Sequence, residues 1–324
     1  MEQKVPISRA ATVGTGLIGA GWAACYAANG MEVTLFDVSA GILKQAEGRV
    51  RAWVDDLVAF GLADRARADA GLAALRATSV LSEAVRSADW IQESAIENLA
   101  LKQALFRDIT AACPAGAIVA SSTSTLPISQ IQVEAVRPER IVLCHPINPP
   151  HLMPGVEIFG SERTSPETVD AAAQFLAAIG KVPIRLKREV PGHVVNRLQF
   201  ALFREAVGIV ESGIADVKDV DLAVTAGLGL RLAMMGQFMV FQLGGGPVGL
   251  KYFLEQFRTA IRVTNSSLST WTELTPSEEQ ILIDGANDEM SGKSYQDVTA
   301  WRDKTLVALL QLLRPYHGPA GARE

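Results

Sequence analysis

The chain has 324 residues, of which 48% are apolar and 20% are charged. This length suggests two domains, and the composition is typical of a globular protein with a large core, not of a disordered chain. Thirty Lys and Arg residues against 35 Asp and Glu residues give a net charge of −5. That balance argues against a nucleic-acid partner, because a broad nucleic-acid surface needs a basic stripe.

The sequence predicts a cytoplasmic protein without a membrane partner. The first residues, Met1-Glu2-Gln3-Lys4, begin no apolar run of the signal-peptide type. The most apolar late stretch, residues 232–250, is interrupted by Gln and Gly residues and is not suited to span a bilayer. The three cysteines lack the spacing of a disulfide framework or a metal site, which suits a reducing compartment.

Strands and helices alternate in the first part of the chain. Short apolar runs bounded by turn residues predict strands at 10–13, 31–36, 78–81, 90–94, 117–120, 141–144, 156–159 and 184–186. Helical spacing of apolar residues predicts helices at 17–28, 39–60, 98–112 and 165–179. Such alternation implies an α/β fold of the Rossmann type, with a mainly parallel sheet covered on both faces.

The pattern changes after Pro191-Gly192, where the alternation of strands ends. From there the apolar spacing predicts helices at 194–210, 217–225, 235–243, 250–263, 276–287 and 295–313. We therefore expect a Rossmann-type domain over residues 1–190 and an all-α domain over residues 191–324.

A glycine motif connects the first predicted strand to the first helix. Gly14, Gly16 and Gly19 have the spacing at which the first glycine permits a tight turn, the second admits a pyrophosphate and the third allows close packing of helix and strand. The amides of the helix start, at Leu17 and Ile18, then face the phosphates. Strand, turn, helix and strand together predict a dinucleotide site, although a glycine turn without a ligand has the same spacing.

Asp37 ends the second predicted strand, 23 residues after Gly14 (37 − 14 = 23). Its carboxylate can accept hydrogen bonds from the adenosine ribose and repels a 2′-phosphate. No Arg follows it directly, since the next residues are Val38 and Ser39. The predicted cofactor is NAD rather than NADP.

Polar residues follow several predicted strands at their carboxyl ends, where open α/β sheets bind ligands. A serine-rich segment, 121–125, comes after one strand, and His145 comes directly after the next. Glu157 is flanked by apolar residues on an interior strand, so its carboxylate should be paired, and His145 is a plausible partner. Either residue alone could also be structural.

A His–carboxylate pair beside a nicotinamide has a clear chemical use. Neutral imidazole accepts the proton of a hydroxyl group while hydride leaves the adjacent carbon, and the carboxylate fixes the tautomer and stabilises the imidazolium. Cys144 suggests a thiol nucleophile, but adjacent strand residues point to opposite faces, so the Cys144-His145 pair is poorly placed for that chemistry.

These segments give the chain a family resemblance. It resembles the 3-hydroxyacyl-CoA dehydrogenase superfamily, within the branch that contains L-gulonate 3-dehydrogenase (lambda-crystallin) and carnitine dehydrogenase. The resemblance covers essentially the whole chain. The segments that carry it are GTGLIG, ESAIENLALK, SSTSTL, HPINPPHLMPGVE, GHVVNRLQ and WRDKTLVALL.

The resemblance implies roles for individual positions. His145 is the expected general base and Glu157 its orienting carboxylate, while Ser124 and Asn196 correspond to ligands of the reacting substrate oxygen. Asn148 corresponds to a support residue in the same pocket. Three further positions are expected near the cofactor: Glu97, Lys102 and Ser122.

Two segments depart from the acyl-CoA enzymes. Ser122 replaces an Asn in the serine-rich segment, and GLGLRLAMMG replaces a short YPMGP-like turn. The second resembles the pattern of the branch that acts on free hydroxy acids. Arg231 in this segment suits a bidentate clamp on a substrate carboxylate, although it could equally be a surface residue.

The expected activity is NAD-dependent oxidation of the 3-hydroxyl of a small, L-gulonate-like 3-hydroxy acid, with no metal. L-carnitine and an L-3-hydroxyacyl-CoA are alternative substrates, and a crystallin-like structural role is the alternative outside enzymology. Apolar stretches in the helical domain, such as residues 200–203 and 234–241, predict an interface, and the resemblance implies a homodimer.

Overall fold

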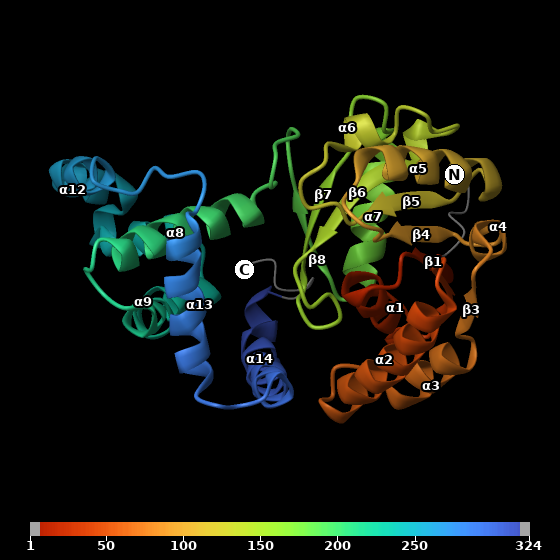
Figure 1. The fold of residues 1–324 in the computed structure, drawn as a ribbon. Coiled ribbons are helices and arrows are strands. Elements are labelled where there is room, and N and C mark those ends of the chain that lie inside the picture. Colours follow the sequence, from red (N-terminus) through yellow and green to blue (C-terminus); the bar gives the residue numbers. More distant parts are fainter. Residues whose placement is uncertain (1–6, 318–324) are drawn as a thin grey trace. The chain divides into compact units, whose positions relative to one another are not determined.

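A computed structural model describes residues 7–317 of the chain, which form two units (Figure 1). One unit runs to Asn196 and takes up the chain again from Leu306, and the other is Arg197–Thr305. The expected domain boundary between residues 190 and 191 lies close to Asn196, where the chain first passes from one unit to the other. The last helix, α14 (Tyr295–His317), differs from the expectation because it is shared between the units. Residues 1–4, on which the absence of a signal peptide was argued, lie outside the described residues.

The first unit is built on one sheet, with eight strands among the described residues. They are β1 (Arg9–Val13), β2 (Glu32–Phe36), β3 (Arg76–Thr78), β4 (Trp90–Glu93), β5 (Ile118–Ser121), β6 (Ile141–Pro146), β7 (Gly155–Phe159) and β8 (Val182–Arg185). The strand order is β3-β2-β1-β4-β5-β6-β7-β8. Every neighbouring pair is parallel except β6 and β7, which are antiparallel. This confirms the predicted α/β class with a mainly parallel sheet.

Helices cover both faces of this sheet (Figure 1). On one face, α1 (Leu17–Ala28), α2 (Ala40–Ala59) and α7 (Pro166–Ala178) pack on strand residues such as Val33 and Trp90. On the other face, α4 (Leu81–Val85), α5 (Leu99–Ala112) and α6 (Ile128–Ile131) pack on the alternate strand residues, among them Ile91. The strands are apolar on both faces, as expected for a buried parallel sheet.

The predicted strand at 78–81 is wrong over most of its length. β3 ends at Thr78, whose hydroxyl accepts a hydrogen bond from the Val80 amide, and Leu81 already begins α4. Sequence analysis also missed α3 (Arg65–Ala73). This helix has no broad apolar stripe, since its buried residues are Ala68 and Gly71. Gly71 lies against the backbone of Ala27 in α1, so small residues attach the helix.

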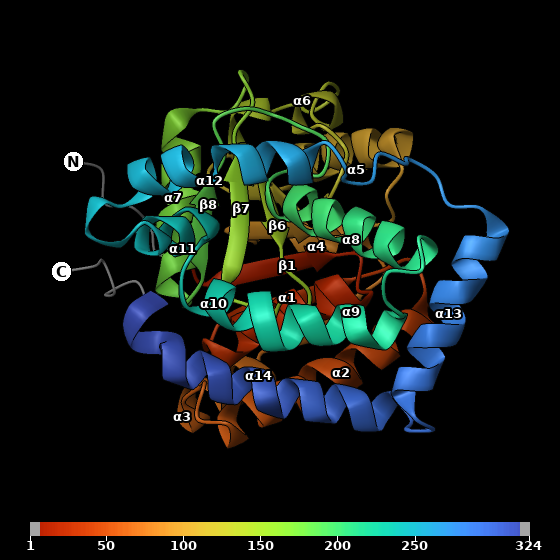
Figure 2. The same ribbon diagram turned by 90° about the vertical axis from the view of Figure 1, so that its left-hand side faces the viewer.

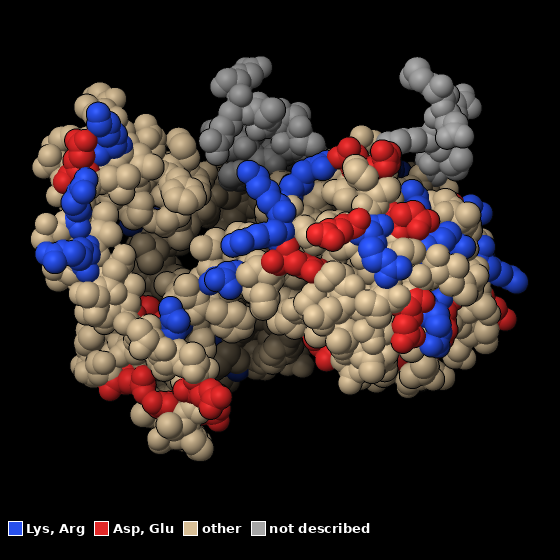
Figure 3. Space-filling model, turned by 90° about the horizontal axis from the view of Figure 1, so that it is seen from above, with Lys and Arg blue, Asp and Glu red and all other residues tan. Residues whose placement is uncertain are grey.

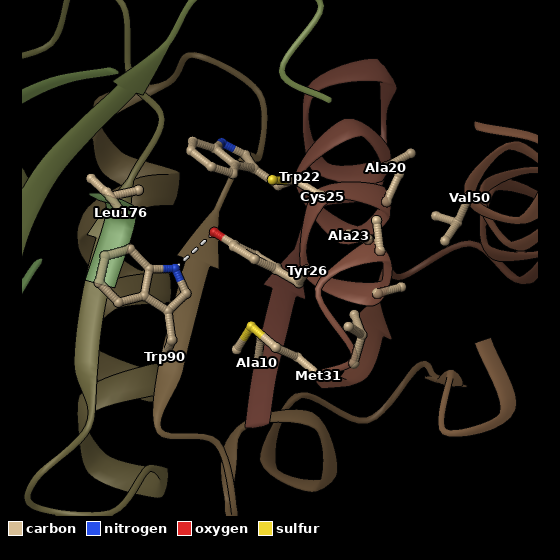
Figure 4. Packing of buried hydrophobic residues seen from close by; sticks show 14 of the residues in the cluster. Ala10, Ala20, Trp22, Ala23, Cys25, Tyr26, Met31, Val50, Trp90 and Leu176 are labelled. Atoms are coloured by element: carbon tan, nitrogen blue, oxygen red, sulfur yellow. Dashed lines mark hydrogen bonds between the residues drawn. The ribbon is translucent and has the colours of Figure 1, made fainter. Parts of the chain in front are cut away.

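The core beside α1 contains large aromatic side chains joined by hydrogen bonds (Figure 4). Trp22, Tyr26 and Trp90 are fully buried, and the Trp90 indole donates to the Tyr26 hydroxyl over 2.8 Å. Tyr26 in turn donates to Gln92 over 3.1 Å. The Gln92 amide nitrogen then donates to Ser122 over 2.9 Å, so the network continues from the core to the serine-rich segment.

The second unit is entirely helical over its described residues (Figure 2). Its helices are α8 (Val195–Glu211), α9 (Val217–Ala223), α10 (Gly229–Met234), α11 (Gln237–Gly244), α12 (Leu250–Asn265) and α13 (Pro276–Met290), followed by the first part of α14. A π-helical turn, Val224–Leu228, joins α9 to α10, and α10 was not predicted. Only five residues of this unit are buried: Val207, Gly208, Val220, Gly245 and Gly249.

Among the described residues, no single helix is long and apolar enough to cross a membrane. Two consecutive helical segments, Val217–Met234 and Gln237–Gly244, are together long and apolar enough by length and composition alone, but the chain bends by 93° between them. Figure 3 shows Lys and Arg side chains interspersed with Asp and Glu on the face that it draws.

Candidate active site

The glycine turn lies between β1 and α1, as predicted. Gly14 has a φ of +86°, and a Cβ there would lie 2.8 Å from the backbone of Ser94 and Ala95. A Cβ on Gly19 would collide with the carbonyl of Gly14. Gly16 is exposed, and a Cβ there would meet no atom within 4 Å. The turn is therefore tight at its ends and open at its centre, which fits a pyrophosphate over the start of α1 at Leu17 and Ile18.

Asp37 follows β2 directly and faces the glycine turn. Its Oδ2 accepts a hydrogen bond from the Thr15 amide over 3.0 Å, and its Oδ1 accepts one from the Ser39 amide over 3.2 Å. The carboxylate therefore holds the turn and the start of α2 in place. It is half-buried, which leaves part of it open to a ribose beside the turn.

Glu97 connects the loop after β4 to the serine-rich segment. One carboxylate oxygen accepts hydrogen bonds from the Thr123 hydroxyl (2.6 Å), the Ser124 amide (3.1 Å) and the amide and hydroxyl of Thr125 (3.1 and 3.0 Å). Burial alone would raise its pKa. The hydrogen bond from Thr123, the charge of Lys102 and the bonds from Thr125 outweigh burial and lower the pKa of Glu97 to about 2. Glu97 is therefore ionised and fixes the backbone at Ser124.

Lys102 lies behind Glu97 rather than on the surface of the site. Only 1% of its side chain is exposed, and its ammonium donates to Glu93 over 2.5 Å and to the Ala95 carbonyl over 3.2 Å. Its distance to Glu97 is 3.4 Å. Three acceptors thus surround a group with three protons. The resemblance implies a place near the cofactor, and this geometry lets Lys102 act there through Glu97.

Ser122 lies in the predicted place at the end of β5. Its hydroxyl accepts from Gln92 and lies 2.8 Å from the Ser94 hydroxyl. Ser94 borders the glycine turn, because its backbone is in close approach to Gly14. The structure therefore brings Ser122 next to the predicted cofactor site.

His145 and Glu157 form the pair that the sequence predicted. They are directly opposite each other in the antiparallel register of β6 and β7. His145 Nδ1 lies 2.8 Å from Glu157 Oε2, and the carboxylate is fully buried. A carboxylate accepts only, so Nδ1 carries the proton of this bond, and Nε2 of a neutral His145 is then the free basic nitrogen.

The second oxygen of Glu157 is held by the start of α8. The amides of Val194 and Val195 donate to Glu157 Oε1 over 2.7 and 2.9 Å. Burial would raise the pKa of Glu157, but the hydrogen bond from His145 and those from the two amides outweigh it and hold the pKa below its ordinary value. The carboxylate is therefore an anion, placed to stabilise an imidazolium at His145.

The remaining predicted residues of the first unit lie on segments around this pair. Ser124 is half-buried in the loop that Glu97 holds, and Asn196 is half-buried in the first turn of α8. Asn148 is exposed and precedes a cis peptide bond to Pro149. The buried Lys181 fixes this loop by donating to the carbonyls of Pro150 and Met153.

Arg231 belongs to the second unit. It lies in α10, directly after the π-helical turn, and it is exposed. Local insertions of this kind in helices are frequent at functional sites.

Two residues at the site were not singled out from the sequence. Glu93 is fully buried and bonded to Ser121 and Lys102, and its place in an apolar strand is the same signal that identified Glu157. His193 lies with its ring centroid 5.2 Å from that of His145, inside a segment quoted above for the resemblance.

Cys144 points into the core, and burial raises the pKa of its thiol, so it is no nucleophile. No group of three or more potential metal ligands occurs in the described part of the chain.

The site combines a Rossmann-type sheet, an open glycine turn with an acid after the second strand, and a histidine bonded to an ionised carboxylate. Together these features are typical of an NAD-dependent dehydrogenase. Residues 9–190 match the family model of the 3-hydroxyacyl-CoA dehydrogenase NAD-binding domain, and residues 192–275 match its C-terminal domain. The chain belongs to the 3-hydroxyacyl-CoA dehydrogenase family. It is an oxidoreductase that acts on CH–OH groups with NAD.

Curated relatives and a solved structure agree with this assignment. The chain is 42% identical to the L-carnitine dehydrogenase of Streptomyces griseus, over 94% of this chain and 90% of the relative. It is 41% identical to that of Streptomyces coelicolor, over 94% of both chains. The crystal structure of 5-formyl-3-hydroxy-2-methylpyridine 4-carboxylic acid 5-dehydrogenase is 30% identical, with a TM-score of 0.81, and the match covers 95% of this chain and 99% of that one.

Proposed function

We propose that the protein oxidises the 3-hydroxyl group of L-carnitine to the 3-keto acid with NAD. The observation that carries this proposal is the identity of about 40%, over almost the full length, to proteins named L-carnitine dehydrogenase. The relatives favour this alternative over the L-gulonate-like acid that was expected first. Both substrates are free 3-hydroxy acids, so the expected chemistry is unchanged.

In this proposal His145 is the general base. Its Nδ1 donates to Glu157, so Nε2 accepts the proton of the substrate hydroxyl, and the buried anion stabilises the imidazolium that forms. Ser124 and Asn196 would hold the substrate oxygen while its charge changes. NAD, held at the glycine turn and Asp37, supplies the hydride acceptor. Glu97 supports the site by fixing the backbone on both sides of Ser124.

The substrate has two charged ends that require different partners. A free carboxylate suits the guanidinium of Arg231, which can donate two parallel hydrogen bonds. A trimethylammonium group is recognised by aromatic faces. The second unit carries such faces in the edge-on pair Phe203 and Trp271 and in the stack of Phe241, Phe253 and Phe257.

The test is the rate of NADH formation with a panel of hydroxy compounds. L-carnitine should be oxidised with the highest kcat/KM, ahead of L-gulonate, 3-hydroxybutyrate and 3-hydroxybutyryl-CoA. His145→Ala should lower kcat by about 10²–10⁴-fold while NADH still binds, because the base acts on the substrate and not on the cofactor. Faster oxidation of L-gulonate or of the thioester would reject the carnitine proposal. A folded protein that oxidises none of them would favour the crystallin-like role.

We also propose a homodimer formed through the second unit. Large apolar side chains on its helices are exposed, among them Phe238 at 80% and Phe200 at 63%, while the unit buries few residues of its own. A second copy of the chain would cover these faces and supply the core that the unit lacks.

We also propose a cytoplasmic location, which is supported by three cysteines that are all buried and unpaired.

A further inference from the structure

A second histidine lies beside the proposed base. His193 is 2% exposed, and its ring is tilted by 54° against that of His145, with 5.2 Å between the centroids. It follows Gly192, and the two residues have φ values of +51° and +75° respectively. The left-handed region is uncommon for residues with a Cβ, so the chain carries some backbone strain to keep a histidine here.

The hydrogen bonds of His193 determine its tautomer. Nε2 lies 3.1 Å from the carbonyl oxygen of Thr123, and a carbonyl only accepts, so Nε2 carries a proton. Burial lowers the pKa of His193 and the neighbouring His145 lowers it further, although the bond to Thr123 opposes them. The ring is therefore neutral. Its Nδ1 is a buried acceptor without a hydrogen-bond partner among the described residues.

This bond joins two segments that carry proposed catalytic groups. Thr123 directly precedes Ser124, and its hydroxyl is held by Glu97. On the other side, the two residues after His193 donate their amides to Glu157, and Asn196 follows. The hydrogen bond from His193 to the Thr123 carbonyl therefore connects the serine-rich segment to the residues that lead into α8.

We propose that His193 is a positioning residue, which sets the distance between Ser124 and the His145–Glu157–Asn196 group by its bond to the Thr123 carbonyl. A neutral ring suits this role, because a second cation beside His145 would oppose formation of the imidazolium. The role rests on the proposed function of His145. It explains why the segment keeps a histidine with one unsatisfied buried nitrogen, which an apolar residue at the same backbone position would not have.

The test compares His193→Phe with His193→Gln. Phe keeps a planar ring but has no donor, whereas the Gln amide can still donate to a carbonyl at similar reach. The first measurement is hydrogen exchange of the backbone amides in residues 122–126, which requires no substrate. Loss of one neutral hydrogen bond changes the equilibrium constant for local opening by roughly tenfold. Exchange should therefore be about tenfold faster in the Phe variant and close to wild type in the Gln variant.

The second measurement is kcat with whichever hydroxy acid the wild type oxidises, together with NADH affinity and Tm. The Phe variant should lose about tenfold or more in kcat with unchanged NADH affinity, and the Gln variant should recover most of it. Equal exchange in wild type and the Phe variant would overturn the proposal, and so would equal loss in both variants. Faster exchange in the Phe variant, with no substrate oxidised by the wild type, would instead refute the proposed function, and the bond to Thr123 would then hold the segment without positioning a catalytic group.

Discussion

At the scale of single residues, the pair His145–Glu157 is the part of the site whose chemistry depends most on one charge. Glu157→Gln preserves shape but removes the anion that stabilises an imidazolium. Turnover should fall by about 10–100-fold, and the acid limb of the pH–rate profile should move to lower pH, because protonation of His145 becomes less favourable without the carboxylate. The measurement is kcat/KM from pH 5 to 9 in a variant shown to be folded by circular dichroism. An unchanged profile would show that the two residues do not act together.

Arg231 allows a test of whether the second unit binds the carboxylate end of the substrate. A desolvated charged pair loses about 2–5 kcal/mol when one partner is removed, so Arg231→Ala should weaken apparent substrate affinity by roughly 30-fold or more. NADH affinity should stay the same. Arg262→Ala on α12 is a matched control, since it is another exposed Arg of the same unit. Equal turnover of the hydroxy acid and its methyl ester by wild type would mean that no carboxylate clamp exists.

Asp37 provides the residue-scale test of cofactor choice. Val38 is 85% exposed beside it, so an Arg at that position has room to meet a 2′-phosphate. Asp37→Ala combined with Val38→Arg should weaken NAD and admit NADP. Asp37→Ala alone should also loosen the glycine turn, because the Thr15 and Ser39 amides lose their acceptor. Comparable kcat/KM values for NAD and NADP in wild type would contradict the charge argument.

At the scale of elements, the Glu97 carboxylate connects the loop after β4 to the serine-rich segment. Its pKa of about 2 lies below its ordinary value, so the stabilisation is fully present above about pH 4.5 and is lost as the pH falls through 2. Glu97→Gln should be less stable than wild type at pH 7, by about 1–2 kcal/mol after allowance for its 34% exposed side chain. The difference should shrink toward pH 2.5. Urea unfolding at several pH values, with Glu47→Gln as control, measures it, and a pH-independent difference would contradict this account.

The elements of the first unit follow closely from apolar periodicity and turn residues. Ser39, Asn98 and Ser165 each cap the helix that the sequence placed after them. The short helices α3, α4 and α6 were missed because they bury few side chains and carry no long periodic stripe. In the second unit, α9 continues through a π-helical turn into α10, a local insertion that apolar spacing does not reveal.

The candidate site was predictable where a residue type contradicts its surroundings. Glu157 on an apolar strand called for a partner, and the antiparallel register supplies His145. The same argument applies to Glu93, which was overlooked. His193 gave no such signal, because its contact with His145 depends on a left-handed backbone that brings residues 48 positions apart together (193 − 145 = 48).

At the scale of the whole molecule, the exposed apolar faces of the second unit lead to a prediction about assembly. Light scattering at micromolar concentration should give the mass of a dimer. Phe238→Glu should shift the protein toward monomer and lower its Tm, because a charge replaces a large apolar side chain on the proposed interface. Val38→Glu, which charges another exposed apolar residue in the first unit, should leave the mass unchanged. A wild-type monomer would reject the proposal.

The division of α14 between the units affects how the protein can fold during its synthesis. Val307 is 4% exposed and belongs to the same buried cluster as Trp22 and Val33, and Gln311 donates to the carbonyl of Phe60. Proteins of several domains generally fold from the N-terminal domain onward as the chain leaves the ribosome. Here the cofactor-binding unit completes its core only after Val307 has emerged, long after the part of the same unit that ends at Asn196. The residues of the helical unit, Arg197–Thr305, lie between the two parts of the cofactor-binding unit, so they have all emerged before that unit can be completed.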